Sequence, residues 1–468
     1  MIDLILIYPL VVGMLIFLIR KKAFDVFAVN SYAVLHFAVS CILVFSESPY
    51  LSSVRYFAVD GTNRIFLLVL SIVFLMAAIY NTGYIRHMKF EEKRIRFYMF
   101  LILIFTFAMT GTTLSTNLGL AWVFVEATTL TTAYLIYFNR TRNAIEAAWK
   151  YVFICSVGIA LAFVGIILLN ISTDRINTLN YSILTVNSFQ FDPFWLKAAF
   201  VFIVFGFGTK MGLAPVHFWL PDAHSESPSP ISALLSATLL NSAFLVILRV
   251  LKILETAGYD SYGRLILMVM GFSSLLVTAV YVNKIRNYKR MLAYSSVENM
   301  GILAIGTALG PAAMYAVMLH VIGHSFAKAS FFLTSGNVLE LFESRRVNRV
   351  SGLNSVDRKT GWLWIFSYLA ICAFPTSSLF ISEYLIIKVM FSQHHYLMCA
   401  LFVILLTVIL HGFAEVVFSM TFGKLPAERE EQVRENKKKL SWCMYVPQML
   451  LLAMVFTLGV YVPPFLRF

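Results

Sequence analysis

The sequence has few charged side chains for its length. Of its 468 residues, 13% are charged and 59% are hydrophobic, whereas a soluble domain of ordinary composition carries about a quarter charged residues. A chain with so little polar surface does not stay in water, which excludes a large soluble domain. The composition therefore predicts an integral membrane protein.

Cysteines are also few, and none stands in a metal-binding pattern. The sequence has no C-x-x-C pair and no G-x-G-x-x-G or Walker pattern. The first absence excludes a self-contained iron–sulfur or zinc site, and the second excludes the common nucleotide sites. We therefore expect no cofactor in this chain. The five cysteines lie far apart in apolar runs: Cys41, Cys155, Cys372, Cys399 and Cys443.

The charges that are present are mainly basic, with a formal net charge of +13. In a membrane protein the first explanation is a set of basic cytoplasmic loops, so no nucleic-acid partner is expected. The N-terminus is apolar from Ile2, and the basic cluster Arg20, Lys21 and Lys22 follows the first apolar run. A cleavable signal peptide has the opposite order, so none is expected here.

Apolar runs separated by charged breaks predict an all-α fold. Each run has about the length, roughly 20 residues, that a helix needs to cross a bilayer. We expect about fourteen transmembrane helices, at residues 2–19, 24–46, 62–84, 97–113, 116–138, 147–170, 194–221, 228–251, 262–283, 290–309, 312–336, 361–391, 396–421 and 441–463.

Basic residues concentrate in the loops that follow odd-numbered spans, whereas the even loops carry only scattered charges such as Arg55 and Arg175. By the positive-inside rule the odd loops are cytoplasmic. Both termini are then expected on the non-cytoplasmic side of a cell inner membrane. The basic residues of the odd loops include Arg86, Lys89, Lys93, Arg94, Arg96, Lys284, Arg286, Lys289, Arg290, Arg345, Arg346, Arg349, Lys437, Lys438 and Lys439.

The seventh and twelfth predicted spans carry helix-breaking residues. Gly212 and Pro215 interrupt the seventh, and Pro375 interrupts the twelfth. Such residues inside spans predict broken helices. With ionisable residues beside both breaks, the pattern suggests two inverted five-helix repeats. We therefore divide the chain into a three-helix segment (1–96), a first repeat of helices 4–8 (97–251), a second repeat of helices 9–13 (252–421), and a cytoplasmic loop with the last helix (422–468).

Several ionisable side chains are expected at membrane depth, where each charge costs roughly 2.5–3.5 kcal/mol and is functional by default. His320, His324 and Lys328 recur at every fourth residue. They therefore share one helical face over about 12 Å, a geometry suited to a proton relay through bridging waters. The full set is Glu126, Lys150, Lys210, His320, His324, Lys328 and Glu383.

Lys210 lies beside the break in the seventh span. Irregular backbone at membrane depth is tolerated where it lines a cavity, so water can reach this lysine. A carboxylate whose distance from Lys210 changes would alter the proton affinity of the amine. We hypothesise that Glu126 is this carboxylate and that the Glu126–Lys210 pair gates proton movement.

Structural roles remain open for the same residues. A buried Glu or Lys can pair simply to fix packing, and Lys150 can extend to water from the membrane boundary. His320 and His324 can hydrogen-bond neighbouring helices together.

Each of three further histidines has two possible roles. His217 and His224, near the end of the seventh span, either line an entrance or exit of the path or cap a turn. His411, with Glu415 one turn beyond, has the same two alternatives. Metal ligation by the histidines of this chain is disfavoured.

Four segments resemble a known family: KMGLAPVHFWLPDAHSESPSPISALLSA, EATTLTTAYLI, HSFAKASFFLTSGN and MLAYSSVENMG. They resemble the antiporter-like membrane subunits of respiratory complex I, related hydrogenases and multisubunit cation/proton antiporters, over roughly residues 60–420. The segment EAAWKYVFICSVGIALAFVGIILL is most similar to component F of hydrogenase-4.

The resemblance implies a core of fourteen helices with two inverted repeats, each holding a half-channel. By position, Glu126 resembles the key glutamate of the fifth helix and Lys210 its partner on the broken seventh helix. Lys328 resembles the central lysine, and Glu383 the terminal group on the broken twelfth helix. Two departures bear on the continuity of the relay: Asn241 stands where many members have a lysine, and Asn299 where a histidine is common.

The expected function is that of a cofactor-free, proton-translocating subunit of a membrane-bound oxidoreductase, either a group 4 hydrogenase of the formate-hydrogenlyase type or a complex I-like NADH dehydrogenase. Its expected partners are the lipid bilayer, other membrane subunits and a peripheral redox arm that holds iron–sulfur and, in a hydrogenase, nickel–iron centres. A second hypothesis is a subunit of a sodium/proton antiporter or an inorganic-carbon uptake complex without redox partners. Sodium in place of the proton and a non-conducting scaffold also remain open.

Overall fold

A computed structural model describes residues 1–46, 55–88, 90–173, 176, 178–424 and 439–463. These residues form helices and no strand, apart from three isolated bridges, which confirms the all-α fold. Four loop charges used to predict orientation, Lys89, Arg175, Lys437 and Lys438, lie outside the described residues.

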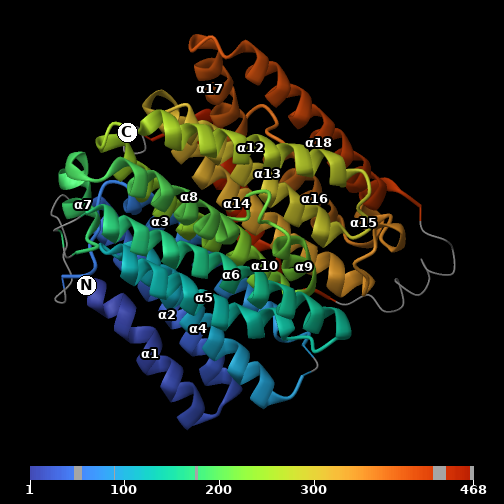
Figure 1. Cartoon of the computed structure of the whole chain (residues 1–468). Helices are drawn as coiled ribbons and strands as arrows, with labels where there is room; N and C mark the ends of the chain where they lie inside the picture. The colour runs from blue at the N-terminus through green and yellow to red at the C-terminus, as the bar shows by residue number, and fades with distance from the viewer. Residues whose placement is uncertain (47–54, 89, 174–175, 177, 425–438, 464–468) are drawn as a thin grey trace. The chain divides into compact units, whose positions relative to one another are not determined.

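The α-helices of the described chain (Figure 1) are α1 (Ile2–Ile19), α2 (Lys22–Phe45), α3 (Asn63–Tyr84), α4 (Glu92–Leu114), α5 (Leu118–Tyr137), α6 (Arg142–Ser172), α7 (Tyr181–Asn187), α8 (Pro193–Met211), α9 (Trp219–Glu226), α10 (Ser229–Leu234), α11 (Leu240–Thr256), α12 (Asp260–Val282), α13 (Tyr288–Ala308), α14 (Pro311–Phe342), α15 (Leu353–Val356), α16 (Arg358–Ile371), α17 (Ser378–Ser392), α18 (Tyr396–Phe422) and α20 (Val446–Val460). A π-helical turn, Leu235–Leu239, joins α10 to α11.

Among the described residues, twelve helical stretches are long and apolar enough to cross a membrane. The predicted count of fourteen requires two more. One would be α13, which has 21 residues but carries Lys289, Arg290 and Glu298. The other would be the pair α16 and α17, which have only 14 and 15 residues. Fourteen spans therefore remain a prediction, whereas the multi-pass membrane architecture is confirmed.

Both predicted helix breaks are present. Helix α8 ends at Met211 because Gly212 adopts the left-handed conformation (φ 80°), which glycine reaches without steric cost; α9 begins at Trp219. Helix α16 ends at Ile371, and α17 begins after Ser377, whose side chain caps the backbone N–H of Phe380. Each break places irregular backbone beside a residue that the sequence analysis selected, Lys210 or Glu383.

The chain forms two compact units, and each draws on three separate segments. Unit 1 contains residues 1–75, 89–219 and 238–269, and unit 2 contains residues 76–88, 220–237 and 270–468. Because the units mix distant segments, this division differs from the four domains predicted along the sequence, whose limits stay a prediction.

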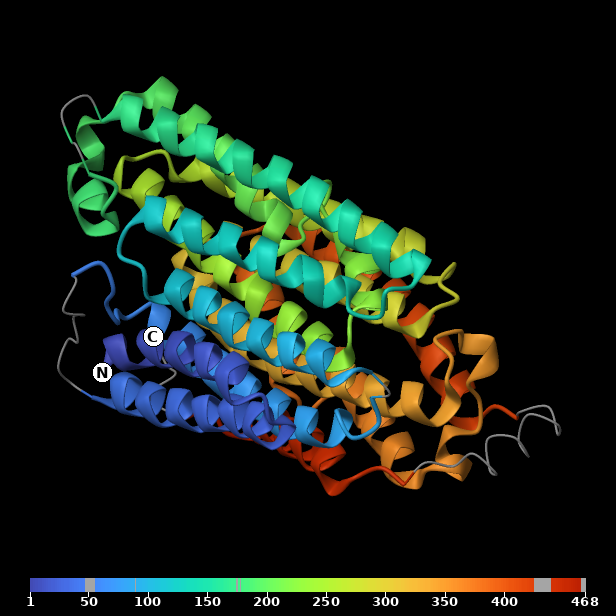
Figure 2. The same ribbon diagram turned by 90° about the horizontal axis from the view of Figure 1, so that it is seen from below.

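Unit 1 is held together by close helix packing around α6 and α8, which lie side by side (Figure 1). A Cβ on Gly206 would stand 2.5 Å from the backbone nitrogen of Ala162, so only glycine permits this approach. Helices α1, α2 and α4 pack against one another at the N-terminal side of the unit (Figure 2).

Unit 2 is built around α14, a helix of 32 residues whose apolar stretch is fully buried. Helices α10, α13, α16, α17 and α20 pack on it. A helix covered on all sides faces no lipid, so its His320, His324 and Lys328 can only meet other protein groups or internal water.

Candidate functional site

Lys210 is a buried basic group of unit 1. It lies in the last turn of α8, and its side chain has no exposed surface. Its Nζ donates a hydrogen bond of 2.8 Å to the Tyr151 hydroxyl on α6 and lies 4.8 Å from the centre of the same ring. The Tyr151 hydroxyl also hydrogen-bonds the Thr132 hydroxyl on α5. The ammonium group of Lys210 is thus held by a chain of neutral hydroxyls.

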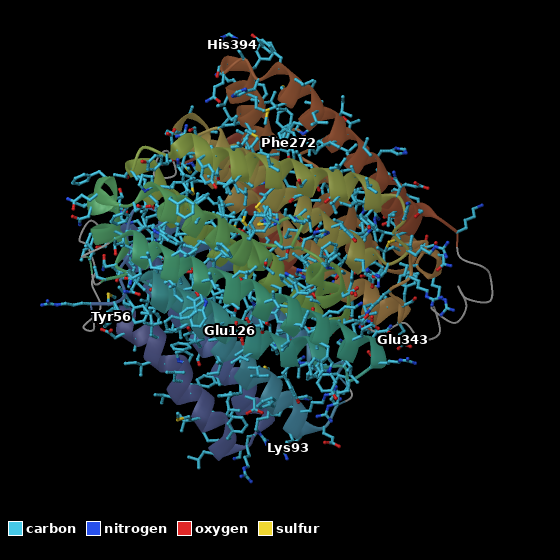
Figure 3. All side chains as sticks on the ribbon, viewed as in Figure 1. Tyr56, Lys93, Glu126, Phe272, Glu343 and His394 are labelled. Atoms are coloured by element: carbon cyan, nitrogen blue, oxygen red, sulfur yellow. The ribbon has the colours of Figure 1, made fainter. Side chains whose placement is uncertain are left out.

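Glu126 lies on α5 and is partly buried (Figure 3). Its carboxylate accepts a hydrogen bond of 3.0 Å from the Thr129 hydroxyl. Among the described residues no ion pair joins Glu126 to Lys210, although Glu126 lies near enough to act electrostatically on the lysine. Thr129 on α5 bonds Glu126, and Thr132, three residues further along, bonds the Tyr151 hydroxyl that accepts from Lys210.

Lys150 is not brought together with these groups. It is exposed on α6, with 46% of its side chain accessible, and it pairs with Glu146 one turn earlier at 2.6 Å. This position matches the alternative in which Lys150 extends from the membrane boundary toward water.

The predicted ladder of unit 2 is fully buried on α14. His320 and His324 lie on one face with parallel rings whose centres are 6.5 Å apart. His320 bridges two helices, since its Nε2 is 3.1 Å from Asn299 Oδ1 on α13 and its Nδ1 is 2.9 Å from Ser382 Oγ on α17. Neither ring nitrogen of His324 has a hydrogen-bond partner among the described residues. Lys328 donates to the Leu292 carbonyl oxygen of α13 at 2.5 Å.

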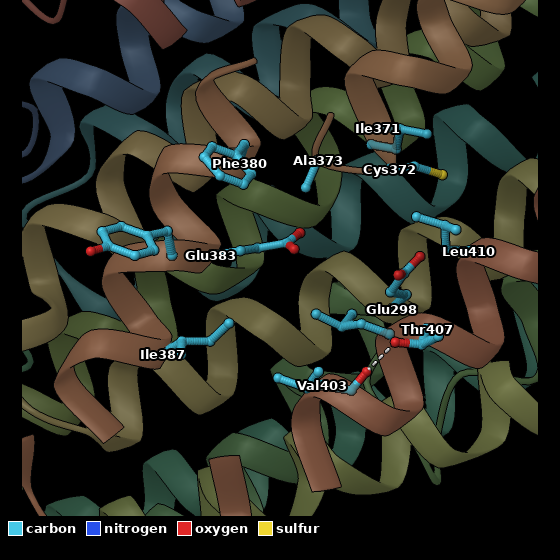
Figure 4. Close-up of a pocket in the computed structure, with 12 residues that line it drawn as sticks. Glu298, Ile371, Cys372, Ala373, Phe380, Glu383, Ile387, Val403, Thr407 and Leu410 are labelled. Atoms are coloured by element: carbon cyan, nitrogen blue, oxygen red, sulfur yellow. Dashed lines mark hydrogen bonds between the residues drawn. The ribbon is translucent and has the colours of Figure 1, made fainter. Parts of the chain in front are cut away.

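Glu383 follows the second break and faces a cavity of about 290 Å³. Glu298 of α13 faces the same cavity, and Figure 4 shows both carboxylates turned into it. Phe380, Tyr384 and Cys372 line other parts of the wall. The structure thus places two carboxylates, from helices far apart in the sequence, in one pocket, whose lining includes the exposed side chains of Tyr384 and Leu410.

Sequence reasoning missed Glu298 as a site residue. It lies near the middle of α13 and is only 7% exposed. The signal was available, because a carboxylate in the middle of a predicted span meets the same criterion that selected Glu126.

The assignment of Lys289 to a loop is wrong, whereas the side of the membrane stays a prediction. Lys289 lies in the first turn of α13, has no exposed surface, and donates from Nζ to the Ser227 carbonyl oxygen at 2.6 Å. The positive-inside rule counts charge near a helix end but does not tell which side chains turn inward.

The short helix α9 carries three ionisable residues of unit 2. Its Asp222 pairs with Arg290 at 3.0 Å, and its Glu226 pairs with Arg345 at 2.6 Å. His224 is fully buried, and neither of its ring nitrogens has a partner in the described part of the chain. The His224 ring stacks on Phe332 with centres 4.8 Å apart.

His224 lies close enough to Lys328 and Lys289 to interact electrostatically with both. His224 thus lies near the buried lysines of unit 2, and its role in a proton path stays a prediction.

The other two histidines predicted for an entrance or exit differ in burial. His217 is 3% exposed, in the segment between α8 and α9. His411 is exposed on α18 and does not line the cavity, although its neighbour Leu410 does. The roles of both stay predictions.

Comparisons with known proteins show which family the chain belongs to. The profile of the NADH:quinone oxidoreductase/Mrp antiporter transmembrane family matches residues 115–409, which include both breaks and every buried group above. The chain belongs to this family.

Individual relatives are similar to this chain in sequence or in fold. The hydrogenase-4 component F homolog of Methylacidiphilum infernorum is 33% identical over 443 residues, which cover 92% of this chain and 90% of that protein. A chain of the membrane-bound sulfane sulfur reductase, an archaeal respiratory membrane complex, superposes with a TM-score of 0.86 at 21% identity over 99% of this chain and 95% of that one. A chain of the Mrp complex from Dietzia sp. gives 0.85 at 18% identity, over 98% and 93%. The last two show the fold alone.

The two departures from the family's usual residues have different surroundings. Asn299 hydrogen-bonds His320, so an amide takes part in the polar contacts of unit 2 at the position where the resemblance implies that a histidine is common. Asn241 follows the π-helical turn Leu235–Leu239 and is buried. Such turns occur often at functional sites.

The described residues contain no group of three or more His, Cys, Asp or Glu side chains placed to hold a metal ion.

Proposed function

We propose that this chain is a proton-translocating membrane subunit of a membrane-bound oxidoreductase complex. Family membership supports the general class, and the similarity to a hydrogenase-4 component F homolog supports a hydrogenase of the formate-hydrogenlyase type within it. A complex I-like NADH dehydrogenase is the other member of the same class. The chain would sit in the cell inner membrane with both termini on the non-cytoplasmic side.

The observation that carries this proposal is the environment of the two central lysines. Lys210 and Lys328 are both fully buried, and each Nζ donates to a neutral oxygen, a tyrosine hydroxyl or a backbone carbonyl. Neither contacts a carboxylate among the described residues. A group that transfers protons must bind and release them, and a permanent ion pair would oppose the release.

The coupling between the redox reaction and proton translocation would be electrostatic. A redox event in a partner subunit would change a nearby charge, alter the interaction between Glu126 and Lys210, and move a proton toward Lys328 and Glu383. Moving one charge against 100 mV costs about 2.3 kcal/mol, about the free energy of a pKa change of nearly two units. Redox centres, iron–sulfur and in a hydrogenase nickel–iron, would lie in the peripheral arm and not in this chain.

The family description also includes the Mrp antiporters, so a subunit of a sodium/proton antiporter or an inorganic-carbon uptake complex is the second candidate function. The same lysines and carboxylates would serve it without a redox partner. Purification of the intact complex decides between the two, because redox subunits with iron or nickel accompany this chain only if the first proposal holds.

Proton translocation is tested with the intact complex in proteoliposomes. We expect Lys210→Met and Lys328→Met each to abolish acidification or alkalinisation of the lumen, whereas Lys388→Met, an exposed lysine on α17, leaves it unchanged. Normal translocation by Lys328→Met would refute the proposal.

A further inference from the structure

Glu298 is a buried carboxylate that acts electrostatically on Lys328 and that the path proposed above does not use. Among the described residues its side chain makes no ion pair, and no hydrogen bond to it is present. A carboxylate that serves only packing is normally hydrogen-bonded, because an unpaired buried polar group is costly. The adjoining cavity is lined by Glu298 itself, so water there could reach its carboxylate.

The position of Glu298 links two groups of the path. Lys328 donates to the Leu292 carbonyl, and Glu298 lies six residues further along α13, about 9 Å at the helical rise. Glu298 interacts electrostatically with Lys328 and also with Glu383. It therefore lies near both the central lysine and the terminal carboxylate of unit 2.

The cavity shared by Glu298 and Glu383 would connect the two carboxylates through water. Its volume of about 290 Å³ is enough for several waters, at about 30 Å³ each in the liquid. The two carboxylates supply the polar groups that ordered water needs. Figure 4 shows Glu298 and Glu383 facing this space from α13 and α17.

We propose that Glu298 is a further proton-carrying residue, and that the cavity which it shares with Glu383 is a hydrated chamber through which protons pass between Lys328 and Glu383. This rests on the proposed function. In one transfer the Lys328 ammonium loses a proton through water to the Glu298 carboxylate, leaving a neutral amine and a neutral acid. The acid then passes the proton through the chamber water to the Glu383 carboxylate.

The chamber suits a proton better than a sodium ion. Sodium would need several oxygen ligands, but the wall beyond the carboxylates is formed largely by apolar side chains such as Ile371, Ile387 and Leu406. The Thr407 hydroxyl, which is also on the wall, donates to the Val403 carbonyl. Stepwise proton transfer needs only water and one titratable group at each end.

The test uses the intact complex in proteoliposomes with electron transfer measured in parallel. Glu298→Gln keeps the shape of the side chain but cannot carry a proton, and we expect translocation per electron to fall roughly a hundredfold. Glu298→Asp should retain more translocation than the Gln variant. Glu415→Gln, an exposed carboxylate on α18, is the matched control and should behave as wild type.

Infrared difference spectra recorded during turnover distinguish a proton-carrying role of Glu298 from a role in packing alone. A carboxylic C=O band that shifts in deuterium oxide should disappear in Glu298→Gln and remain in Glu415→Gln. If Glu298→Gln fails to assemble, Thr407→Phe fills the chamber from α18 while leaving Glu298 in place, and should also block translocation.

Wild-type translocation by Glu298→Gln or by Thr407→Phe, in a complex that Lys328→Met inactivates, overturns this inference and leaves the proposed function standing. Wild-type translocation by Lys328→Met removes the proposed function itself. Sodium-dependent translocation that persists in Glu298→Gln would equally refute the proton chamber.

Discussion

At the scale of single residues, the buried bases of the two units are positioned by neutral oxygens. Tyr151 positions Lys210, and the Leu292 carbonyl positions Lys328. His320 is fixed at both ring nitrogens, whereas His324 is fixed at neither. A proton path requires this mixture, because a group with permanent partners holds its orientation and a group without them can exchange partners with water.

The hydrogen bond from Lys210 to the Tyr151 hydroxyl can be removed by deleting a single oxygen atom. Tyr151→Phe keeps the ring over Lys210 and deletes the hydrogen bond, which is worth about 1.5–3 kcal/mol when one partner is charged. We expect proton translocation to fall by about tenfold or more, measured as lumen acidification per electron transferred. Tyr8→Phe, which removes a 3.0 Å bond to Ser31 in the N-terminal helices, should change translocation little. Equal effects of the two substitutions would contradict a role for Tyr151.

Residue type and spacing predicted much of this site, but not the contacts. Glu126, Lys210, His320, Lys328 and Glu383 stand out because ionisable groups are rare in apolar runs. Tyr151 could not be found this way, since tyrosine is common in such runs and only the fold shows which hydroxyl meets a lysine.

At the scale of elements, the breaks at Gly212 and Pro375 could be predicted because glycine and proline act locally on the backbone. The inward turn of the first residues of α13 could not, since the sequence gives the depth of Lys289 but not the direction of its side chain. The same applies to α9, whose ion pairs join residues more than sixty positions apart. Local signals thus locate the elements, and long-range contacts decide which charges are buried.

The ion pair between Glu226 and Arg345 should hold α9 in place. Their side chains are 8% and 22% exposed, so Arg345→Met leaves a carboxylate largely buried without its partner. We expect a loss of about 1–3 kcal/mol, which is less than for a fully buried pair. The double variant Glu226→Gln/Arg345→Met should recover part of it. Thermal unfolding of the purified complex measures the cycle, and additive losses would show that the pair does not stabilise α9.

The packing of α6 on α8 gives a second element-scale prediction. Gly206→Ala places a Cβ 2.5 Å from the Ala162 backbone nitrogen, and such overpacking costs about 1–3 kcal/mol. We expect a lower yield of assembled complex and a lower unfolding temperature. At Gly61 a Cβ would meet nothing within 4 Å, so Gly61→Ala should be neutral. A Gly206→Ala complex as stable as wild type would mean that the two helices separate without cost.

At the scale of the whole molecule, each compact unit holds one buried lysine of the proposed path: Lys210 in unit 1 and Lys328 in unit 2. If the units hold half-channels of one path, the lysines act in series. One substitution already closes a series path. The double variant Lys210→Met/Lys328→Met should therefore translocate no fewer protons than the less active of the two single variants, since the effects of residues that act as a unit are not additive. Independent paths predict instead that each single variant keeps part of the wild-type stoichiometry and that only the double variant loses all of it. Counting protons per electron in proteoliposomes for the four complexes separates the two arrangements, and about half of the wild-type stoichiometry in both single variants would exclude a series path.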